Sequence, residues 1–326
     1  MAPVGRYAQR VSTSDLAGEP GTGAGAGRAH SGSDDAVPSA DSPGVGVAAL
    51  IRQRLGECSP AERRVARALL ASYPAAGLGT VASLAERAEV SAPTVLRFLS
   101  RLGFGGYPEF QRALRDELAE RETSPLTAYR AAERTGAPPA GALPRAAATL
   151  PDAVAGTLAE LPQGELDAAV RLFADQQLRV TAAGGRFSGL LAHYLVLHLM
   201  QVRGGSRVLP STPVERTDML VDVGRRDLFA LFDFRRYEEP TLALAREVTA
   251  RGARVVLFTD RWLSPVAGLA EVVLPSRVES PSPYDSFVPT LALVETLVAA
   301  LIDRLGPAAG KRLKAMEQAQ QTYGGS

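Results

Sequence analysis

The stretch Thr80–Leu102, TVASLAERAEVSAPTVLRFLSRL, decides the fold of the first half of the chain. It predicts two helices joined by a tight turn, because its apolar residues recur with helical spacing. Thr80 is the expected N-cap of the first helix, and Ser91, followed by Pro93, is the expected N-cap of the second. Glu89 occupies a turn position where glycine is common, because the backbone there is often left-handed. The apolar residues that define the inner faces are Leu84, Ala85, Ala88, Val95, Phe98, Leu99 and Leu102.

The second of these helices has a polar face opposite its apolar residues. In a helix-turn-helix unit, the N-terminal side chains of the second helix face base edges in the major groove. The candidate DNA contacts are Ser91, Ala92, Thr94, Arg97 and, nearer the phosphates, Arg101. The alternative is a helical hairpin that contacts protein, since residues 45–121 are only mildly basic.

Several segments of residues 45–121 are more specific than a generic helix requires. They are Ser59–Ala66 (SPAERRVA), Leu84–Glu86, Val90–Ser91, Thr94–Val95, Arg97–Phe98 and Leu102–Phe110 (LGFGGYPEF). In these segments the chain resembles the N-terminal domain of RpiR-type transcriptional regulators. The resemblance implies a DNA-binding domain with double-stranded operator DNA as its partner.

The second half of the chain alternates short β-rich segments with helix-length amphipathic segments. The expected strands are 178–183, 207–209, 228–234, 254–259 and 271–274, and the expected helices are 188–202, 240–251, 265–270 and 287–305. This alternation predicts an α/β fold with a doubly wound, mainly parallel five-stranded sheet. Ligands of such sheets bind outside the carboxyl ends of the strands, so the loops after these ends are the candidate sites.

The loop after the first expected strand carries the clearest candidate site. The paired glycines Gly184 and Gly185 permit close approach of a ligand to the backbone, and free N–H groups at the next helix favour an anion. Ser188 is expected to cap that helix and to donate to the anion. An ordinary strand-to-helix turn is the alternative interpretation.

Residues 151–310 are similar to the sugar isomerase (SIS) domain of RpiR-type regulators, which binds phosphosugars at this loop. Two departures change the expected chemistry. Arg186 interrupts the usual Gly-x-Gly-x-Ser loop, and Asp233–Thr241 (DFRRYEEPT) replaces a hydroxyl-rich second loop. Arg186, Arg235 and Arg236 are therefore expected to hold a phosphate or carboxylate, with Tyr237 packed against the rest of the ligand. Alternatively, Asp233, Glu238 and Glu239 neutralise these arginines.

Other candidate residues have mainly structural interpretations. Ser264 with Pro265 is expected to start a short helix, and Asp285 or Ser286 either caps the last helix or reaches the pocket. His193 and His198 lie on different sides of one helix, so a shared metal is not expected. No cofactor is expected, and an isomerase or lyase is disfavoured because no histidine or cysteine lies in the candidate loops.

Composition sets the wider limits. The 326 residues carry a net charge of +1, and 46% of them are hydrophobic, which excludes a fibrous or wholly disordered protein. Cys58 is the single cysteine, and neither a signal peptide nor a membrane span is visible, so we expect a soluble cytoplasmic protein without membrane partners. The expected domains are a disordered tail at 1–44, the DNA-binding domain at 45–121, a linker at 122–150, the α/β effector and dimerisation domain at 151–310, and a C-terminal tail at 311–326.

The residues and the resemblance together predict a transcription factor that responds to an anionic metabolite, a phosphosugar or a sugar acid. A homodimer or a dimer of dimers is expected, because helix-turn-helix proteins read paired half-sites. A ligand-blind DNA-binding scaffold and a sugar-phosphate isomerase or lyase of the same fold are the alternatives.

Overall fold

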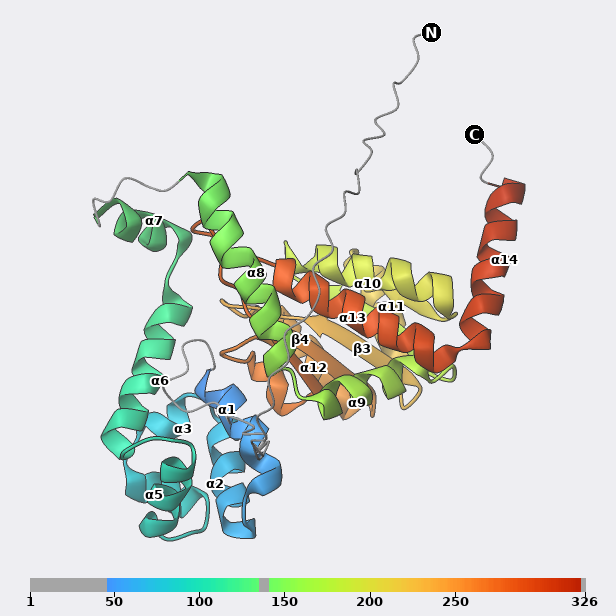
Figure 1. The fold of residues 1–326 in the computed structure, drawn as a ribbon. Helices are drawn as coiled ribbons and strands as arrows, with labels where there is room; N and C mark the ends of the chain where they lie inside the picture. The colour runs from blue at the N-terminus through green and yellow to red at the C-terminus, as the bar shows by residue number, and fades with distance from the viewer. Residues whose placement is uncertain (1–45, 135–140, 324–326) are drawn as a thin grey trace, which may run out of the picture. The chain divides into compact units, whose positions relative to one another are not determined.

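The computed structural model of the protein describes residues 46–134 and 141–323 (Figure 1). The tail predicted at 1–44 lies outside these residues.

Residues 47–122 form a helical domain around one apolar core. Its elements are α1 (Val47–Arg54), the 3-10 helix η1 (Leu55–Glu57), α2 (Pro60–Ala71), α3 (Ala75–Leu78), α4 (Val81–Arg87), α5 (Ala92–Arg101) and α6 (Tyr107–Glu122). Helix α2 begins with a capping box, in which the Ser59 hydroxyl accepts from the Glu62 N–H and the Glu62 carboxylate accepts from the Ser59 N–H. Phe98 of α5 and Phe110 of α6 are fully buried in the same core.

Helices α4 and α5 confirm the predicted helix-turn-helix. The Thr80 hydroxyl accepts from the Ser83 N–H at 3.1 Å, as expected of an N-cap. The turn residue Glu89 adopts φ 53°, so a glutamate occupies the left-handed conformation that favours glycine. Gly103, at φ 98°, ends the second helix. Phe104 then packs against Phe110, with their ring centres 5.4 Å apart.

The segment between the two domains is more helical than a linker. It contains α7 (Pro125–Arg134), and α8 (Ala142–Glu160) begins inside the expected linker and continues to residue 160. Helix α8 is tied to the α/β domain, because the Thr157 hydroxyl accepts from the Arg277 N–H at 2.9 Å. Of the described residues in 122–150, most are therefore helix.

The α/β domain confirms the doubly wound prediction with a five-stranded, all-parallel sheet. The strands β1 (Arg179–Gly184), β2 (Ser206–Val208), β3 (Asp227–Phe232), β4 (Arg254–Asp260) and β5 (Val272–Ser276) lie in the order β2-β1-β3-β4-β5. The helices are α9 (Gln163–Ala174), α10 (Ser188–Val202), α11 (Pro213–Val221), α12 (Glu239–Ala250), η2 (Pro265–Gly268), α13 (Val288–Leu305) and α14 (Pro307–Tyr323).

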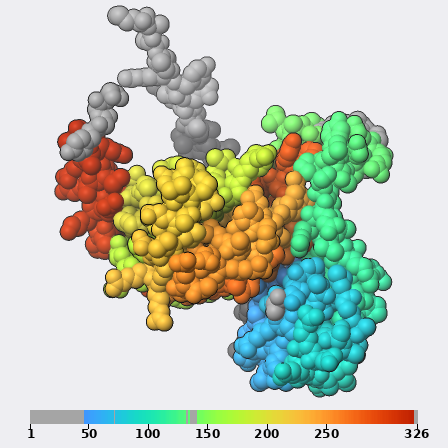
Figure 2. All heavy atoms as spheres, turned by 180° about the vertical axis from the view of Figure 1, so that it is seen from behind, coloured from blue at the N-terminus to red at the C-terminus, as the bar shows by residue number. Residues whose placement is uncertain are grey.

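Alternate residues of the strands enter two separate cores, one on each face of the sheet. Ala230 and Phe232 of β3 pack under α9, α10 and α13, which lie on one face (Figure 1). Phe229 and Leu231 of the same strand pack under α11 and α12 on the other face. Figure 2 shows this second side of the molecule, where the yellow and orange spheres belong to residues between α11 and β5. Burial on both faces accounts for the apolar sequence of β3 after its first residue, Asp227.

Three elements differ from the expectation. Helix α11 was not predicted, because its Val214 and Val221 are exposed and its apolar residues have no clear period. The short helix expected at 265–270 is the 3-10 helix η2, and residues expected to form a C-terminal tail lie in α14 up to Tyr323. Within the described residues, no helix has both the length and the apolar character that crossing a membrane requires.

Replacing Glu89 with glycine is expected to stabilise the protein. The change removes the left-handed strain of a residue with a Cβ, and we expect the free energy of unfolding to rise by about 0.5–1 kcal/mol. Urea denaturation of Glu89→Gly against wild type measures the effect. The matched control is Glu86→Gly, inside α4, which should lower the free energy of unfolding by about 1 kcal/mol. Equal destabilisation by both changes would contradict the strained turn.

Candidate functional site

Helix α5 presents a polar face whose side chains form a local network. Ser91 occupies the N-cap position, but its hydroxyl bonds to the Thr94 hydroxyl at 3.0 Å instead of capping the helix backbone. Thr94 is only 8% exposed and accepts from the Arg97 guanidinium at 3.3 Å. Thr94, which the sequence places on the polar face of this helix, is thus buried, and two neighbours hold its hydroxyl. Arg97 is the exposed end of this chain of hydrogen bonds.

The remaining two predicted DNA contacts, Ala92 and Arg101, differ in their exposure and in their hydrogen bonds. Ala92 is half-buried at the start of α5. Arg101 pairs with Glu62 at 3.1 Å and donates to the Glu57 carbonyl at 3.1 Å. Arg101 thus joins α5 to α2, and only its exposed edge is available to a phosphate.

A cavity of about 430 Å³ opens beside the carboxyl ends of β1 and β3. Five of the seven residues predicted to bind a ligand line it, namely Gly185, Arg186, Ser188, Arg235 and Arg236. The other two, Gly184 and Tyr237, do not line it. The other lining residues are Pro125, Phe187, Asp233, Phe234, Glu238, Tyr284, Asp285 and Phe287.

The loop after β1 is held by the Ser188 hydroxyl. This hydroxyl accepts from the Gly185 N–H at 2.9 Å and donates to the Phe232 carbonyl at the end of β3, also at 2.9 Å. Ser188 is therefore not the helix cap that the sequence suggested. Phe187 occupies the N-cap position, and the single proton of the Ser188 hydroxyl is already used. Gly184 serves packing, because a Cβ there would lie 2.8 Å from the Gly189 nitrogen.

Both arginines of the loop after β3, Arg235 and Arg236, line the cavity. Arg236 has φ 78°, a left-handed conformation that costs energy in a residue with a side chain. Arg236 and Arg186 both line the cavity, and within residues 46–134 and 141–323 neither has a hydrogen-bond or ion-pair partner. Two unpaired guanidiniums beside the first turn of α10 make this cavity electrostatically suited to an anion.

The acidic residues of this loop form no ion pair with those two arginines within the described residues, although the Glu238 carboxylate lines the same cavity. Asp233 accepts from the Ser264 hydroxyl and from the Glu238 N–H, and Glu239 lies 3.7 Å from Arg246. Arg235 pairs with Asp285 from the loop after β5. The neutralised network that a ligand-blind scaffold requires is therefore absent at Arg186 and Arg236 within the described residues.

Tyr237 faces away from the cavity, toward a buried carboxylate. Its hydroxyl donates to Asp260 at 2.7 Å, and the Arg121 guanidinium lies 4.8 Å from the centre of its ring. Burial raises the pKa of Asp260 to about 6, although hydrogen bonds from Tyr237 and from the N–H groups of Arg235 and Trp262 oppose the shift. Burial likewise raises the pKa of Asp233 to about 6.

Two family models match the chain. The model of a helix-turn-helix domain of the rpiR family matches residues 45–121, and the model of the SIS domain matches residues 172–300. The N-terminal part of the chain thus matches the rpiR family, and the C-terminal part matches the SIS domain. The SIS domain carries the cavity described above, and the helix-turn-helix domain contains α4 and α5.

A curated relative and two solved structures are similar to this chain. The HTH-type transcriptional regulator HexR of Pseudomonas aeruginosa is 44% identical over 69 residues, which are 21% of this chain and about a quarter (24%) of that relative. The sugar isomerase domain of an RpiR transcription factor from Sphaerobacter thermophilus is 24% identical with a TM-score of 0.49, over 52% of this chain and 94% of that one. NanR of Vibrio vulnificus, complexed with ManNAc-6P, is 19% identical with a TM-score of 0.46, over 84% and 98%.

Sequence reasoning missed most of the aromatic wall of the cavity. Phe187, Tyr284 and Phe287 line it beside the buried Phe234, which meets Phe287 edge to face at 5.0 Å. Asp285, one of two alternatives in its loop, does reach the cavity, whereas the Ser286 hydroxyl accepts from the Val288 N–H. Among the described residues, no cluster of histidine, cysteine, aspartate or glutamate suits a metal ion.

The raised pKa of Asp260 predicts a pH dependence of stability. Between its unfolded pKa near ~3.9 and its folded pKa, the native state binds more protons, so its contribution to stability falls as the pH rises. We expect Asp260→Asn to remove about 1–2 kcal/mol of the stability loss between pH 5 and pH 8. Urea denaturation at both values measures it. Exposed Asp116→Asn is the control, and an Asp260→Asn protein with the wild-type pH slope would contradict the prediction.

Proposed function

We propose that this chain is a DNA-binding transcriptional regulator whose SIS domain binds an anionic metabolite. The rpiR-family match of residues 45–121, and their likeness to the regulator HexR, support the DNA-binding half. The observation that carries the effector half is the pair of guanidiniums, Arg186 and Arg236, which line one cavity and are unpaired within the described residues. A DNA-binding role also fits the cytoplasmic location expected from the sequence.

The chemistry of the cavity suits a phosphate or carboxylate attached to a polar body. Arg186 and Arg236 can each bind such a group through two parallel N–H donors. The first turn of α10 adds the positive end of a helix dipole. Glu238 lines the same cavity and can accept from ligand hydroxyls. Phosphosugars are the favoured class because of the SIS-domain match, and sugar acids are the second class.

We place DNA recognition on α5, with Arg97 as the principal base contact and Ser91, Ala92 and Thr94 at the helix start. Thr94 acts mainly by orienting Arg97, because its hydroxyl accepts from that guanidinium. Arg101 contacts a phosphate with its exposed edge. A homodimer or a dimer of dimers would place two such helices on paired half-sites.

Arg97→Ala is expected to weaken specific DNA binding by about 1–3 kcal/mol, the usual worth of a good base contact. Thr94→Ala should have a smaller effect in the same direction, because it removes only the hydroxyl that orients Arg97. Mobility shifts on fragments selected from random DNA by the wild-type protein measure both. Arg254→Ala, an exposed arginine at the start of β4, is the control. Unchanged sequence preference in Arg97→Ala would contradict the recognition helix.

Phosphosugars and sugar acids are expected to raise the melting temperature of the wild-type protein, because a ligand that binds only the folded state stabilises it. Arg186→Gln and Arg236→Gln should each lose most of this shift, and Arg254→Gln should keep it. The wild-type response should also weaken with added salt. Thermal denaturation against a panel of anions measures these effects. No shift with any anion would remove the proposed effector role and favour a ligand-blind scaffold.

An enzymatic role has weaker support, and we propose none. An isomerase needs a group in the cavity that moves protons, and Asp233, whose pKa burial raises to about 6, is the candidate. That carboxylate is held by Ser264 and by the Glu238 backbone. Conversion of a phosphosugar that binds, followed by NMR and lost in Asp233→Asn, would overturn this view.

A further inference from the structure

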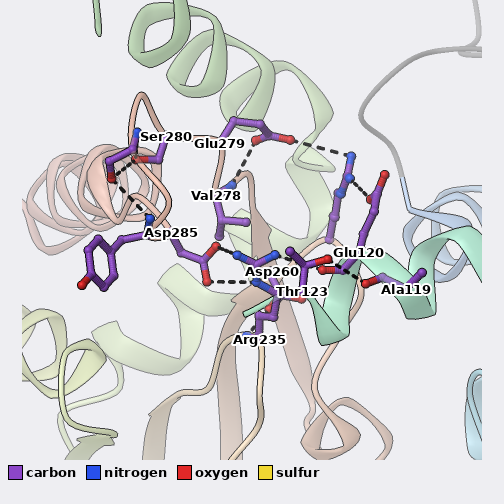
Figure 3. Close-up of polar contacts among 12 residues, drawn as sticks. Ala119, Glu120, Thr123, Arg235, Asp260, Val278, Glu279, Ser280 and Asp285 are labelled. Atoms are coloured by element: carbon purple, nitrogen blue, oxygen red, sulfur yellow. Dashed lines mark hydrogen bonds and ion pairs between the residues drawn. The ribbon is translucent and has the colours of Figure 1, made fainter. Parts of the chain in front are cut away.

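Arg235 forms a wall between the effector cavity and a second cavity of about 260 Å³ at the end of α6. Its side chain is 13% exposed. The residues that its guanidinium contacts line one or both of these cavities. Nε and Nη2 donate to the two oxygens of Asp285, and Nη1 donates to the Glu120 carbonyl at 3.0 Å (Figure 3). One arginine thus touches the proposed ligand space and the last turn of α6.

The last turn of α6 is held to the SIS domain by further contacts from the same loops. The Arg261 guanidinium donates to the Glu120 carboxylate, and it also lies 3.7 Å from Glu279. Arg121 stacks on Tyr237, which follows Arg235 and Arg236 in the loop after β3. In this loop Arg235 and Tyr237 contact α6. Arg236, which lies between them, lines the effector cavity and has no partner among the described residues.

An anion in the effector cavity changes the balance of charge at Arg235. Asp285 also lines that cavity, so its carboxylate would face a second negative charge, while the Arg235 guanidinium would gain a second acceptor. Both effects favour an arrangement in which Arg235 turns from Asp285 and the Glu120 carbonyl toward the ligand. The ligand thus makes different contacts when Arg235 is bonded to Asp285 and when Arg235 has turned toward the ligand. A ligand can shift a conformational equilibrium only if its contacts differ between the two states.

We infer that Arg235 is the positioning residue that couples effector occupancy to the DNA-binding domain, an inference that rests on the proposed function. Its release from the Glu120 carbonyl removes one of the contacts that hold the end of α6, beside those of Arg261 and Tyr237. Phe110 and Leu114 of α6 pack in the same core as Phe98 and Leu99 of the recognition helix. A shift of α6 is therefore transmitted to α5 through a packed core rather than through the connecting segment.

The protein contains its own reporter of this step. Trp262 is the single tryptophan, and the Arg235 and Arg261 guanidiniums lie 5.4 Å and 4.7 Å from the centre of its ring. Movement of Arg235 removes a cation from one of these positions. The emission of Trp262 is therefore expected to change when glucose 6-phosphate, the probe anion, binds the full-length wild-type protein. No change in emission at a concentration that raises the melting temperature would overturn the inference.

The coupling itself is measured as the ratio of DNA dissociation constants with and without saturating glucose 6-phosphate. We expect this ratio to differ from one by at least roughly fivefold in the wild type and to fall to about one in Arg235→Gln, whatever happens to anion affinity itself. Arg254→Gln is the matched control and should keep the wild-type ratio. A wild-type ratio in Arg235→Gln would overturn the coupling role while leaving the effector site intact.

Asp285→Asn tests the same step without removing the arginine. It weakens the hold on Arg235, so its DNA affinity without any anion should move in the direction that the anion produces in the wild type. A shift in the opposite direction, or none, would count against the inference. This variant also covers the case in which Arg235→Gln does not fold. The absence of any thermal shift by anions in the wild type would instead sink the proposed function, and this inference with it.

Discussion

The hydroxyl of Ser188 joins the ends of two neighbouring parallel strands, and the geometry of the proposed effector site depends on it. It accepts from the Gly185 N–H after β1 and donates to the Phe232 carbonyl at the end of β3. Because that hydroxyl is used internally, the anion-binding role passes to side chains. Arg186 and Arg236 leave the two joined loops on the cavity side, and Gly184 lets the turn of α10 approach the strand closely.

The loop after β3 both lines the proposed effector cavity and contacts α6. In five consecutive residues from Asp233 to Tyr237, it supplies a buried carboxylate, an aromatic wall, a cavity arginine and two contacts around α6. Arg236, between Arg235 and Tyr237, adopts a left-handed backbone conformation. The left-handed conformation costs free energy, and it occurs in the loop that contacts both α6 and the ligand cavity.

Much of the fold follows from local patterns in the sequence. Apolar periodicity predicts α4, α5, α10 and α13, and β-rich segments predict the five strands, because these signals arise within one element. Glu89 is recognised as an unusual turn residue for the same reason. Helix α11 escapes detection because Val214 and Val221 are exposed, so its apolar residues do not mark a buried face.

The candidate site is predictable only in part, because its details depend on partners distant in the sequence. Gly185, Arg186 and Arg236 are expected at the cavity from strand order alone. The pairing of Arg235 with Asp285, fifty residues away, is not, and neither is the turn of Tyr237 toward Asp260. The burial of Thr94 is not predictable either, because helical spacing shows the direction of a side chain but not its hydrogen bonds.

Anion binding by Arg186 and Arg236 is tested most directly by a crystal structure of the full-length protein with a phosphosugar that raises its melting temperature. We expect phosphate oxygens within about 3 Å of the Arg186 and Arg236 guanidiniums, the ordinary length of a charge-assisted hydrogen bond. Phosphate bound away from the loops after β1 and β3, with Arg186 and Arg236 still unpaired, would contradict it.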